Sequence, residues 1–252
     1  MTQGPGDWDA TVYDRVADPQ ARWGATVLER LPLDGDETAL DAGCGTGRVT
    51  ELLLERLPRG RVIALDASPS MLVEARSRLA RFGDRVTFVQ ADLARPLPLD
   101  EPVDAILSTA TFHWVLDHDA LFANLAAVLR PGGWLVAQCG GAGNVAKTLE
   151  IVRSLAPDFM REYRFETAEA TRDRLATAGF VDIRTWLSDE PTRFEPGEPF
   201  EAFLATAVLR THLDRLPERE RKPFVASVAA QMPEPVLDYV RLNIVARRSS
   251  EG

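Results

Sequence analysis

The chain has 252 residues, of which 45% are hydrophobic and 27% are charged, and its formal net charge at pH 7 is −9. This length suits one large α/β domain with its own core, and the acidic balance gives a nucleic-acid substrate little electrostatic support. The first residues lack the basic start and apolar core of a signal peptide, and no apolar run is long enough to span a membrane. We therefore expect a cytoplasmic protein with no membrane or nucleic-acid partner.

Near the N-terminus, residues 7–31 are expected to form a helical cap. Residues 22–31 place Trp23, Val27, Leu28 and Leu31 at helical spacing, so this helix can pack on a sheet. The two cysteines of the chain, Cys44 and Cys139, have neither zinc-ligand nor redox-pair spacing, and we expect both to be reduced.

Residues 38–66 carry the most informative pattern of the chain. In order they hold a short apolar strand (39–42), a turn with Gly43, Gly45 and Gly47, a helix (49–57), a second strand (62–65) and Asp66. Glycines at the first switch of such a βαβ unit let the backbone approach a ligand closely, and a carboxylate after the second strand can accept both hydroxyls of a ribose. The unit is typical of a nucleoside-cofactor site.

The spacing of the turn indicates which cofactor this is. A dinucleotide fingerprint needs a third glycine where this chain has Arg48. The pattern is instead Asp41-x-Gly43-x-Gly45-x-Gly47, which resembles motif I of the class I S-adenosylmethionine-dependent methyltransferases. An acid suits a cationic sulfonium ligand and would repel a phosphate. A glycine turn in an unrelated α/β protein, or a nicotinamide enzyme with a degenerate fingerprint, remains the alternative.

The rest of the chain continues the alternation of strands and helices. Further strands are expected over residues 86–91, 102–109, 134–138, 180–187 and 239–246, and further helices over residues 69–82, 119–129, 144–155 and 167–178, with two more inside 199–232. These elements predict a single methyltransferase domain over residues 1–252, an α/β fold with a Rossmann-like, doubly wound, seven-stranded sheet. The resemblance implies that the last strand is antiparallel, that residues 38–140 are the cofactor-binding core, and that residues 199–232 form a helical lid.

The resemblance also implies S-adenosyl-L-methionine as the cofactor, with S-adenosyl-L-homocysteine as the product. It places Asp41 near the ammonium group, Asp66 at the ribose, and Met71 and Asp92 at the adenine. The other cofactor-binding candidates are Gly43, Cys44, Gly45, Thr46, Gly47, Ala67, Ala91, Leu93 and Thr109. Met71 fits a plain core position equally well, and Asp92 fits a helix or turn cap.

The loop after the fourth expected strand should face the transferable methyl group. His113 is the catalytic candidate there, because its pKa lies near neutrality and it could deprotonate a hydroxyl or hydrogen-bond a carboxylate. A packing role, or one of steadying the cofactor, is the alternative. Substrate candidates are Phe112, His113 and Trp114 as a wall and Tyr13 and Trp23 as parts of a lid, although both lid aromatics could simply pack the N-terminal helix. Arg22, Arg164, Arg210 and His212 could pair with an acidic substrate or could lie on the surface.

Several phrases together narrow the resemblance. Trp8-Asp9-x(3)-Tyr13, Ala91-Asp92, His113-Trp114 and LRPGG are similar to those of methyltransferases related to the trans-aconitate and malonyl-carrier-protein O-methyltransferases. Those enzymes methylate a carboxylate, but they commonly have a glutamine where this chain has His113. The expected activity is methyl transfer to a small molecule, at a carboxylate or hydroxyl oxygen, by a monomer or homodimer without a metal site. A non-catalytic S-adenosylmethionine-binding protein or a nicotinamide-dependent oxidoreductase is the alternative.

Overall fold

The computed structural model describes residues 18–157 and 163–250. Its main sheet has seven strands in the order β3-β2-β1-β4-β5-β9-β6. These are β1 (Thr38–Ala42), β2 (Arg61–Asp66), β3 (Val86–Gln90), β4 (Val103–Thr109), β5 (Leu129–Gly140), β6 (Phe180–Asp189) and β9 (Val240–Arg248). Strands β1 to β5 pair in parallel, and β9 runs antiparallel to both of its neighbours. The predicted fold class is therefore confirmed.

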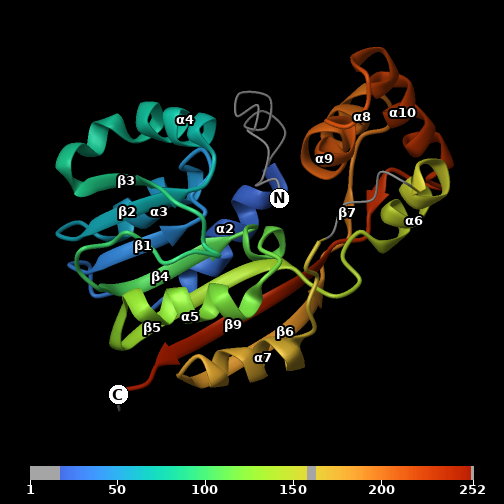
Figure 1. Cartoon of the computed structure of the whole chain (residues 1–252). Coiled ribbons are helices and arrows are strands. Elements are labelled where there is room, and N and C mark those ends of the chain that lie inside the picture. The colour runs from blue at the N-terminus through green and yellow to red at the C-terminus, as the bar shows by residue number, and fades with distance from the viewer. Residues whose placement is uncertain (1–17, 158–162, 251–252) are drawn as a thin grey trace.

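Helices cover both faces of this sheet, because central strands such as β1 and β4 are buried almost along their whole length and so on both of their faces. One face packs against α2 (Asp18–Glu29), α3 (Arg48–Arg56) and α4 (Pro69–Leu79), and the other against α5 (His118–Val128) and α7 (Ala168–Thr177). Figure 1 shows α5 and α7 in front of the sheet and α2 and α3 behind it. A 3-10 helix (Ala80–Arg85) follows α4, and a second one (Phe112–Trp114) follows β4.

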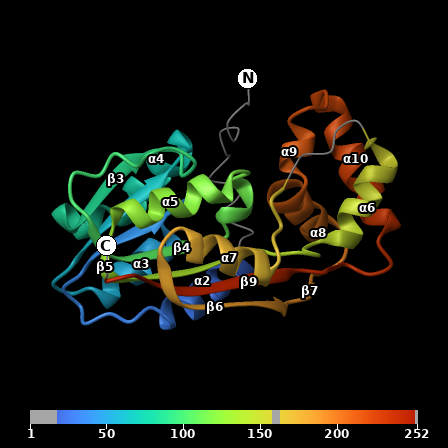
Figure 2. The same ribbon diagram turned by 60° about the horizontal axis from the view of Figure 1, so that its bottom comes forward.

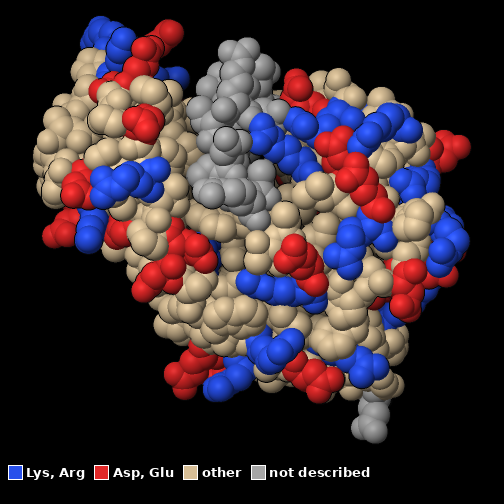
Figure 3. Space-filling view, turned by 180° about the vertical axis from the view of Figure 1, so that it is seen from behind, with Lys and Arg blue, Asp and Glu red and all other residues tan. Residues whose placement is uncertain are grey.

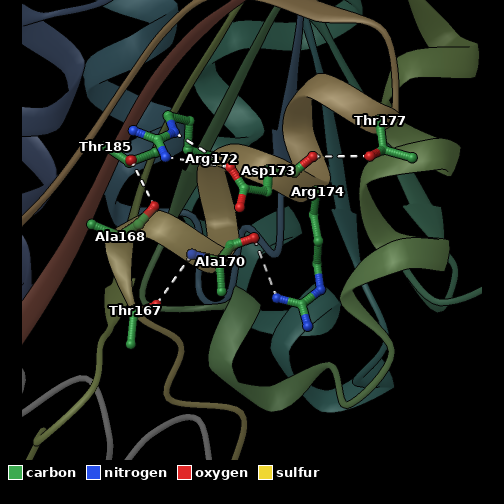
Figure 4. Close-up of polar contacts among 8 residues, drawn as sticks. All are labelled: Thr167, Ala168, Ala170, Arg172, Asp173, Arg174, Thr177 and Thr185. Atoms are coloured by element: carbon green, nitrogen blue, oxygen red, sulfur yellow. Dashed lines mark hydrogen bonds and ion pairs between the residues drawn. The ribbon is translucent and has the colours of Figure 1, made fainter.

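The start of α7 shows how a local sequence signal fixes an element. The hydroxyl of Thr167 accepts the N–H of Ala170 at 3.1 Å, which caps the helix although the favoured Glu is absent. Thr185 of β6 donates to the carbonyl of Ala168 at 2.8 Å and ties the helix to the strand (Figure 4).

A helical lobe stands beside the end of the sheet where β5 ends and β9 begins (Figures 1 and 2). It consists of α6 (Ala146–Leu155), α8 (Glu198–Phe203), a π-helical turn (Leu204–Val208), α9 (Arg210–Leu213) and α10 (Glu218–Gln231). Two short strands, β7 (Thr192–Arg193) and β8 (Val236–Leu237), pair at its base. Phe200, Phe203, Leu204, Val225 and Val228 form its own buried core. Where the sequence predicts one first helix after residue 199, the structure has three short helical pieces.

Charged side chains of both signs are interspersed on the face of the molecule shown in Figure 3, without a continuous basic area. Among the described residues, no helix has the length and apolar character needed to cross a bilayer.

Candidate functional site

The glycine turn between β1 and α3 has the backbone that the motif requires. Gly43, Gly45 and Gly47 have φ angles of +86°, +54° and +82°, a region that side-chain-bearing residues rarely adopt. A Cβ on Gly43 would lie 2.2 Å from the hydroxyl oxygen of Thr111, so this glycine also permits close packing. A Cβ on Gly45 would meet nothing within 4 Å. The middle of the turn therefore presents bare backbone to open space, as a ligand cradle does.

Asp66, at the end of β2, is tied to this turn. Its carboxylate accepts the N–H of Gly45 at 2.8 Å and that of Ser68 at 2.9 Å. Ser68 also caps α4 by accepting the N–H of Met71, so the carboxylate joins the glycine turn to the start of the next helix. Burial raises the pKa of Asp66, and the backbone donors oppose this shift.

Asp66→Ala should weaken binding of S-adenosylhomocysteine on the order of tenfold or more, because a charged hydrogen-bond acceptor contributes about 1.5 to 3 kcal/mol. Calorimetric titration measures this change. Asp100→Ala, at an exposed position, is the control and should bind like the unmodified protein. Equal affinity in both variants would contradict the ribose assignment.

Asp41, at the end of β1, is only 1% exposed. Its Oδ2 accepts the hydroxyl of Thr50 at 2.6 Å, whereas its Oδ1 has no hydrogen-bond partner among the described residues. Burial, with a smaller contribution from nearby Asp66, raises the pKa of Asp41 to about 7. A buried carboxylate oxygen without a partner beside a bare glycine turn fits a ligand that brings a cation.

The remaining cofactor candidates lie around these strand ends. The N–H of Ala91 donates to the carbonyl of Asp66 at 3.2 Å, which holds the loop after β3 against β2. Asp92 is exposed and accepts the N–H of Ala94, so it does cap the turn. Met71 is buried at the first turn of α4, Leu93 belongs to the core, and Ala67 and Thr109 are half-buried.

Two members of the glycine motif contribute to packing. Cys44 is buried against Ala64 and Leu72, and burial raises the pKa of its thiol well above the usual value. Thr46 is buried, and its carbonyl accepts the Nε–H of Arg78. The side chain of Cys44 and the carbonyl of Thr46 therefore fix the glycine turn against the neighbouring strand and helix.

A pocket that is partly open to solvent lies between the strand ends and the helical lobe. It is lined by Ala110, His113, Trp114, Asn144, Val145, Leu149, Tyr163, Phe165, Ala207, Val208, Tyr239 and Arg241. The loop after β4 supplies one wall, the helical lobe a second, and the first residues around β9 a third. Of the sequence-predicted substrate residues, the pocket brings together His113 and Trp114.

His113 is buried, and its ring is held in a definite orientation. Its Nδ1 accepts the backbone N–H of Gly140 at 3.3 Å, and Phe165 stacks on the ring at 5.7 Å between centroids. Burial lowers the pKa of His113 well below 6.5, and Arg241 lowers it further. The ring is therefore neutral, and we assign its proton to Nε2 because Nδ1 is an acceptor. This histidine is a hydrogen-bond donor in the resting protein.

Among the described residues that line the pocket, Arg241 carries the positive charge, and the sequence predictions missed it. Only 3% of the residue is exposed; its Nε donates to Gln138 at 3.4 Å and its guanidinium lies 4.7 Å from the ring of Trp23. Gln138 is fixed in turn by Asn243, whose Oδ1 accepts its amide at 2.8 Å. The signal that could have revealed it is an arginine inside the apolar strand sequence YVRLNIVA, because an arginine is rarely fully buried unless it is paired.

Asn144 adds a third polar group. Its Oδ1 accepts the N–H of Val240 at 3.0 Å, which orients the amide and leaves Nδ2 as a donor. Arg241, neutral His113 and Asn144 are thus donors, and the described lining residues include no Asp, Glu or Lys.

Several predicted substrate residues lie elsewhere. Phe112 does not form a pocket wall: the 3-10 turn directs it into the core, where it is 1% exposed and packs on Phe122. Arg164 is ion-paired with Glu166 at 2.5 Å and does not line the pocket. Trp23 acts behind the pocket, stacking on Arg241 and contacting the ring of Tyr239 at 5.1 Å.

The other candidates give less information. Arg210 and His212 lie in α9, outside the described pocket lining, and the buried His212 ring contacts that of Tyr163 at 6.2 Å. Residues 7–17 of the predicted N-terminal cap, which include Tyr13, lie outside the described residues. The side chain of Arg22 is also not described.

Comparisons with known proteins agree with this geometry. The model of a methyltransferase domain matches residues 39–133, which run from β1 to the beginning of β5. The trans-aconitate 2-methyltransferase of Methylobacterium nodulans is 32% identical over 96% of this chain and 99% of its own length. The enzyme of the same name from Escherichia coli strain 55989 is 30% identical over 96% of this chain and 99% of its own length.

A solved structure with a similar fold is that of Haemonchus contortus phosphoethanolamine N-methyltransferase 2 with S-adenosylhomocysteine and phosphomonomethylethanolamine. Its TM-score is 0.65 at 19% identity, and the match covers 96% of this chain and 57% of that one. At this identity the likeness concerns the fold alone.

Proposed function

Because the chain belongs to the S-adenosylmethionine-dependent methyltransferases, we propose that it methylates a carboxylate oxygen of a small molecule. One observation carries this proposal: the pocket joins the Arg241 guanidinium to a neutral, proton-donating His113. An anion is stabilised by such a set of donors. An ionised carboxylate needs no base, whereas a hydroxyl or amine acceptor does.

The cofactor site fits S-adenosylmethionine on the observations of Asp41 and the glycine turn. Asp41 has a buried carboxylate oxygen without a partner among the described residues, which we assign to the ammonium group, and Gly45 offers bare backbone. Asp66, whose carboxylate accepts the N–H of Gly45, is the proposed partner of the ribose hydroxyls. When bound, the cofactor supplies a methyl group that positive sulfur has already activated for displacement by the acceptor oxygen. The contribution of the protein is then to orient the acceptor and to exclude water.

Each pocket group has a proposed part in that orientation. Arg241 pairs with the acceptor carboxylate, held in place by Gln138 and Trp23. The Nε2–H of His113 donates to one carboxylate oxygen and leaves the lone pairs of the other free to attack. Trp114 and Phe165 flank the imidazole, and their rings limit access of water to it.

The direct test is to incubate the protein with methyl-labelled S-adenosylmethionine and a panel of carboxylic acids, each paired with its amide and its primary alcohol. We expect label in methyl esters, recognised by mass and by release as methanol in mild base, and none in the amides or alcohols. Stable methyl ethers from the alcohols, without esters from the acids, would contradict the proposal.

The role of His113 has a separate test. His113→Leu should lower kcat/KM for an acid on the order of tenfold, the effect of about 1.4 kcal/mol from one lost hydrogen bond to a charged group. His113→Gln keeps an amide donor and should retain most of the activity. A general base would make both variants equally inactive. The rate at saturating cofactor should also be flat from pH 7 to 9, because burial and Arg241 lower the pKa of His113 well below 6.5 and the ring is neutral over this range.

A further inference from the structure

Residues 163–166, which precede α7, lie against His113 and supply two rings of the pocket. The N–H of Arg164 donates to the carbonyl of His113 at 3.1 Å, and Phe165 stacks on the imidazole with centroids 5.7 Å apart. Tyr163 stacks in turn on Phe165 at 5.1 Å, and both rings line the pocket. The placement of this segment therefore decides what covers one face of the imidazole.

Phe165 also lies against the residue that orients His113. A Cβ on Gly140 would be 2.7 Å from the ring of Phe165, and the N–H of Gly140 is the donor to Nδ1 of His113. The ring of Trp114 lies 4.9 Å from the imidazole, measured between centroids. A side chain packed this closely keeps one rotamer, and displacing Phe165 would give the imidazole room to turn.

The carboxylate of Glu166 ties this segment to the helices in front of the sheet. It lies 2.5 Å from Nε of Arg164 and 3.4 Å from the guanidinium of Arg174 in α7. Arg174 also pairs with Asp119 of α5 at 3.1 Å. Only 12% of the Glu166 side chain is exposed, so solvent and salt screen its two ion pairs less than they screen pairs on the surface. Glu166 is thus the anion through which the segment is attached to α7.

The backbone of Glu166 places it beside the end of β5. Glu166 forms a parallel bridge with Gly141, and its carbonyl accepts the N–H of Ala142 at 2.9 Å. Glu166 is not among the described lining residues of the pocket, so it can act on an acceptor only through its neighbours. We propose, on the basis of the proposed function, that Glu166 is a positioning residue: it holds Phe165 against His113 and so keeps the Nε2–H of His113 directed at the acceptor carboxylate.

The first experiment observes the imidazole directly by NMR and needs no substrate. The chain has three histidines, so ring-labelled histidine gives three sets of ring signals, and His113→Leu identifies the set of His113. Glu166→Gln keeps the size of the side chain and removes its charge. We expect it to shift the ring proton signals of His113 downfield, toward those of an unstacked histidine, because the ring current of Phe165 then acts on them less.

Three further variants test the same link. Arg174→Gln removes the tie to α7 but leaves Glu166 in place, and it should move the His113 signals in the same direction. Asp119→Asn removes the other acid that pairs with Arg174, at a side chain that is 80% exposed, and is the matched control that should leave the signals unchanged. Glu166→Asp keeps the charge and should restore part of the stacking.

Kinetics then test whether Glu166 acts through His113. Glu166→Gln should lower kcat/KM for the best acid about fivefold, without changing the affinity for S-adenosylhomocysteine. In the His113→Leu background the same change should cause no further loss, because the group that it positions is absent. A residue that only stabilises the fold would lower kcat/KM equally in both backgrounds.

The outcomes separate the two proposals. Equal losses in the two backgrounds, or His113 signals that stay in place in both Glu166→Gln and Arg174→Gln, would overturn the positioning role and leave carboxylate methylation intact. Ester formation from none of the acids, by a protein that still binds S-adenosylhomocysteine, would overturn the proposed function itself. The NMR comparison would still decide in that case whether Glu166 holds the imidazole.

Discussion

Arg241→Gln should lower kcat/KM for the acid acceptor on the order of 100-fold, while S-adenosylhomocysteine binds as before. The expected size follows from removing one partner of a buried charge pair, which typically weakens binding by about 2 to 5 kcal/mol. Glutamine can still accept or donate a hydrogen bond at this position, but it provides no charge for the substrate carboxylate. Steady-state kinetics with the best acid of the panel, together with calorimetry of the product cofactor, measures the two values.

Arg247→Gln is the matched control for this change. Arg247 is on the same strand, β9, but it is half-exposed and donates to the carbonyl of Gly132, outside the pocket lining. It should leave kcat/KM unchanged. Arg241→Lys keeps the charge without the planar fork and should recover part of the loss. If Arg241→Gln lost cofactor affinity and acid turnover together, or Lys and Gln behaved alike, Arg241 would be a structural residue and not a substrate ligand.

Much of the fold could be predicted because each strand and helix has its own local pattern. The apolar run before Gly43, the Ser68-Pro69 helix start and the β-rich segment before Arg247 each occur where the structure has an element. The helical lobe was less predictable. Its first predicted helix is interrupted by the π-helical turn Leu204–Val208, and apolar spacing alone does not distinguish i to i+4 from i to i+5 hydrogen bonding.

The cofactor end of the site could be predicted better than the substrate end for a physical reason. Asp41, the glycines and Asp66 lie within one βαβ unit, so their spacing in sequence reflects their spacing in space. Arg241 and His113 are 128 positions apart, and only the antiparallel pairing of β9 with β5 places Gly140 opposite Arg241 and Gln138 opposite Asn243. No local pattern contains that register.

The different positions of Phe112 and His113 also could not be predicted from the sequence. Adjacent aromatic residues in an extended loop could both face a ligand, and no sequence pattern distinguishes the two positions. The 3-10 turn Phe112–Trp114 rotates the first into the core and leaves the next two at the pocket.

Asp41→Asn should have opposite effects on cofactor binding and on stability, a combination that a folding defect cannot produce. Asparagine has the same shape and can still accept the hydroxyl of Thr50, but it cannot pair with the cofactor ammonium group. Affinity for S-adenosylhomocysteine at pH 8 should therefore fall on the order of 100-fold, about 3 kcal/mol for a buried charge pair.

The pH dependence follows from the raised pKa of Asp41. Because this pKa is about 7 in the empty protein, the carboxyl is protonated below pH 7 and must lose its proton to bind a cation. Affinity of the unmodified protein should fall as the pH is lowered from 8 to 5.5, with a proton released on binding, and should level off above about pH 8. Calorimetry in two buffers of different ionisation enthalpy measures both quantities. Asp41→Asn should abolish the proton release, whereas Asp100→Asn, at an exposed aspartate, should retain it.

Asp41→Asn should raise the free energy of unfolding of the unligated protein at pH 8, although it lowers the affinity for the cofactor. The folded-state pKa of Asp41 is raised from 3.8 to about 7, so the native state holds this proton more tightly than the unfolded chain does. The contribution of Asp41 to the free energy of unfolding is therefore fully present below about pH 4 and is lost as the pH rises through 7. Asp41→Asn removes this loss, and the unligated variant should melt at a higher temperature than the unmodified protein at pH 8. A lower melting temperature at pH 8 would mean that the carboxylate is stabilised in the empty protein, which would remove the basis for assigning its unpartnered oxygen to the cofactor.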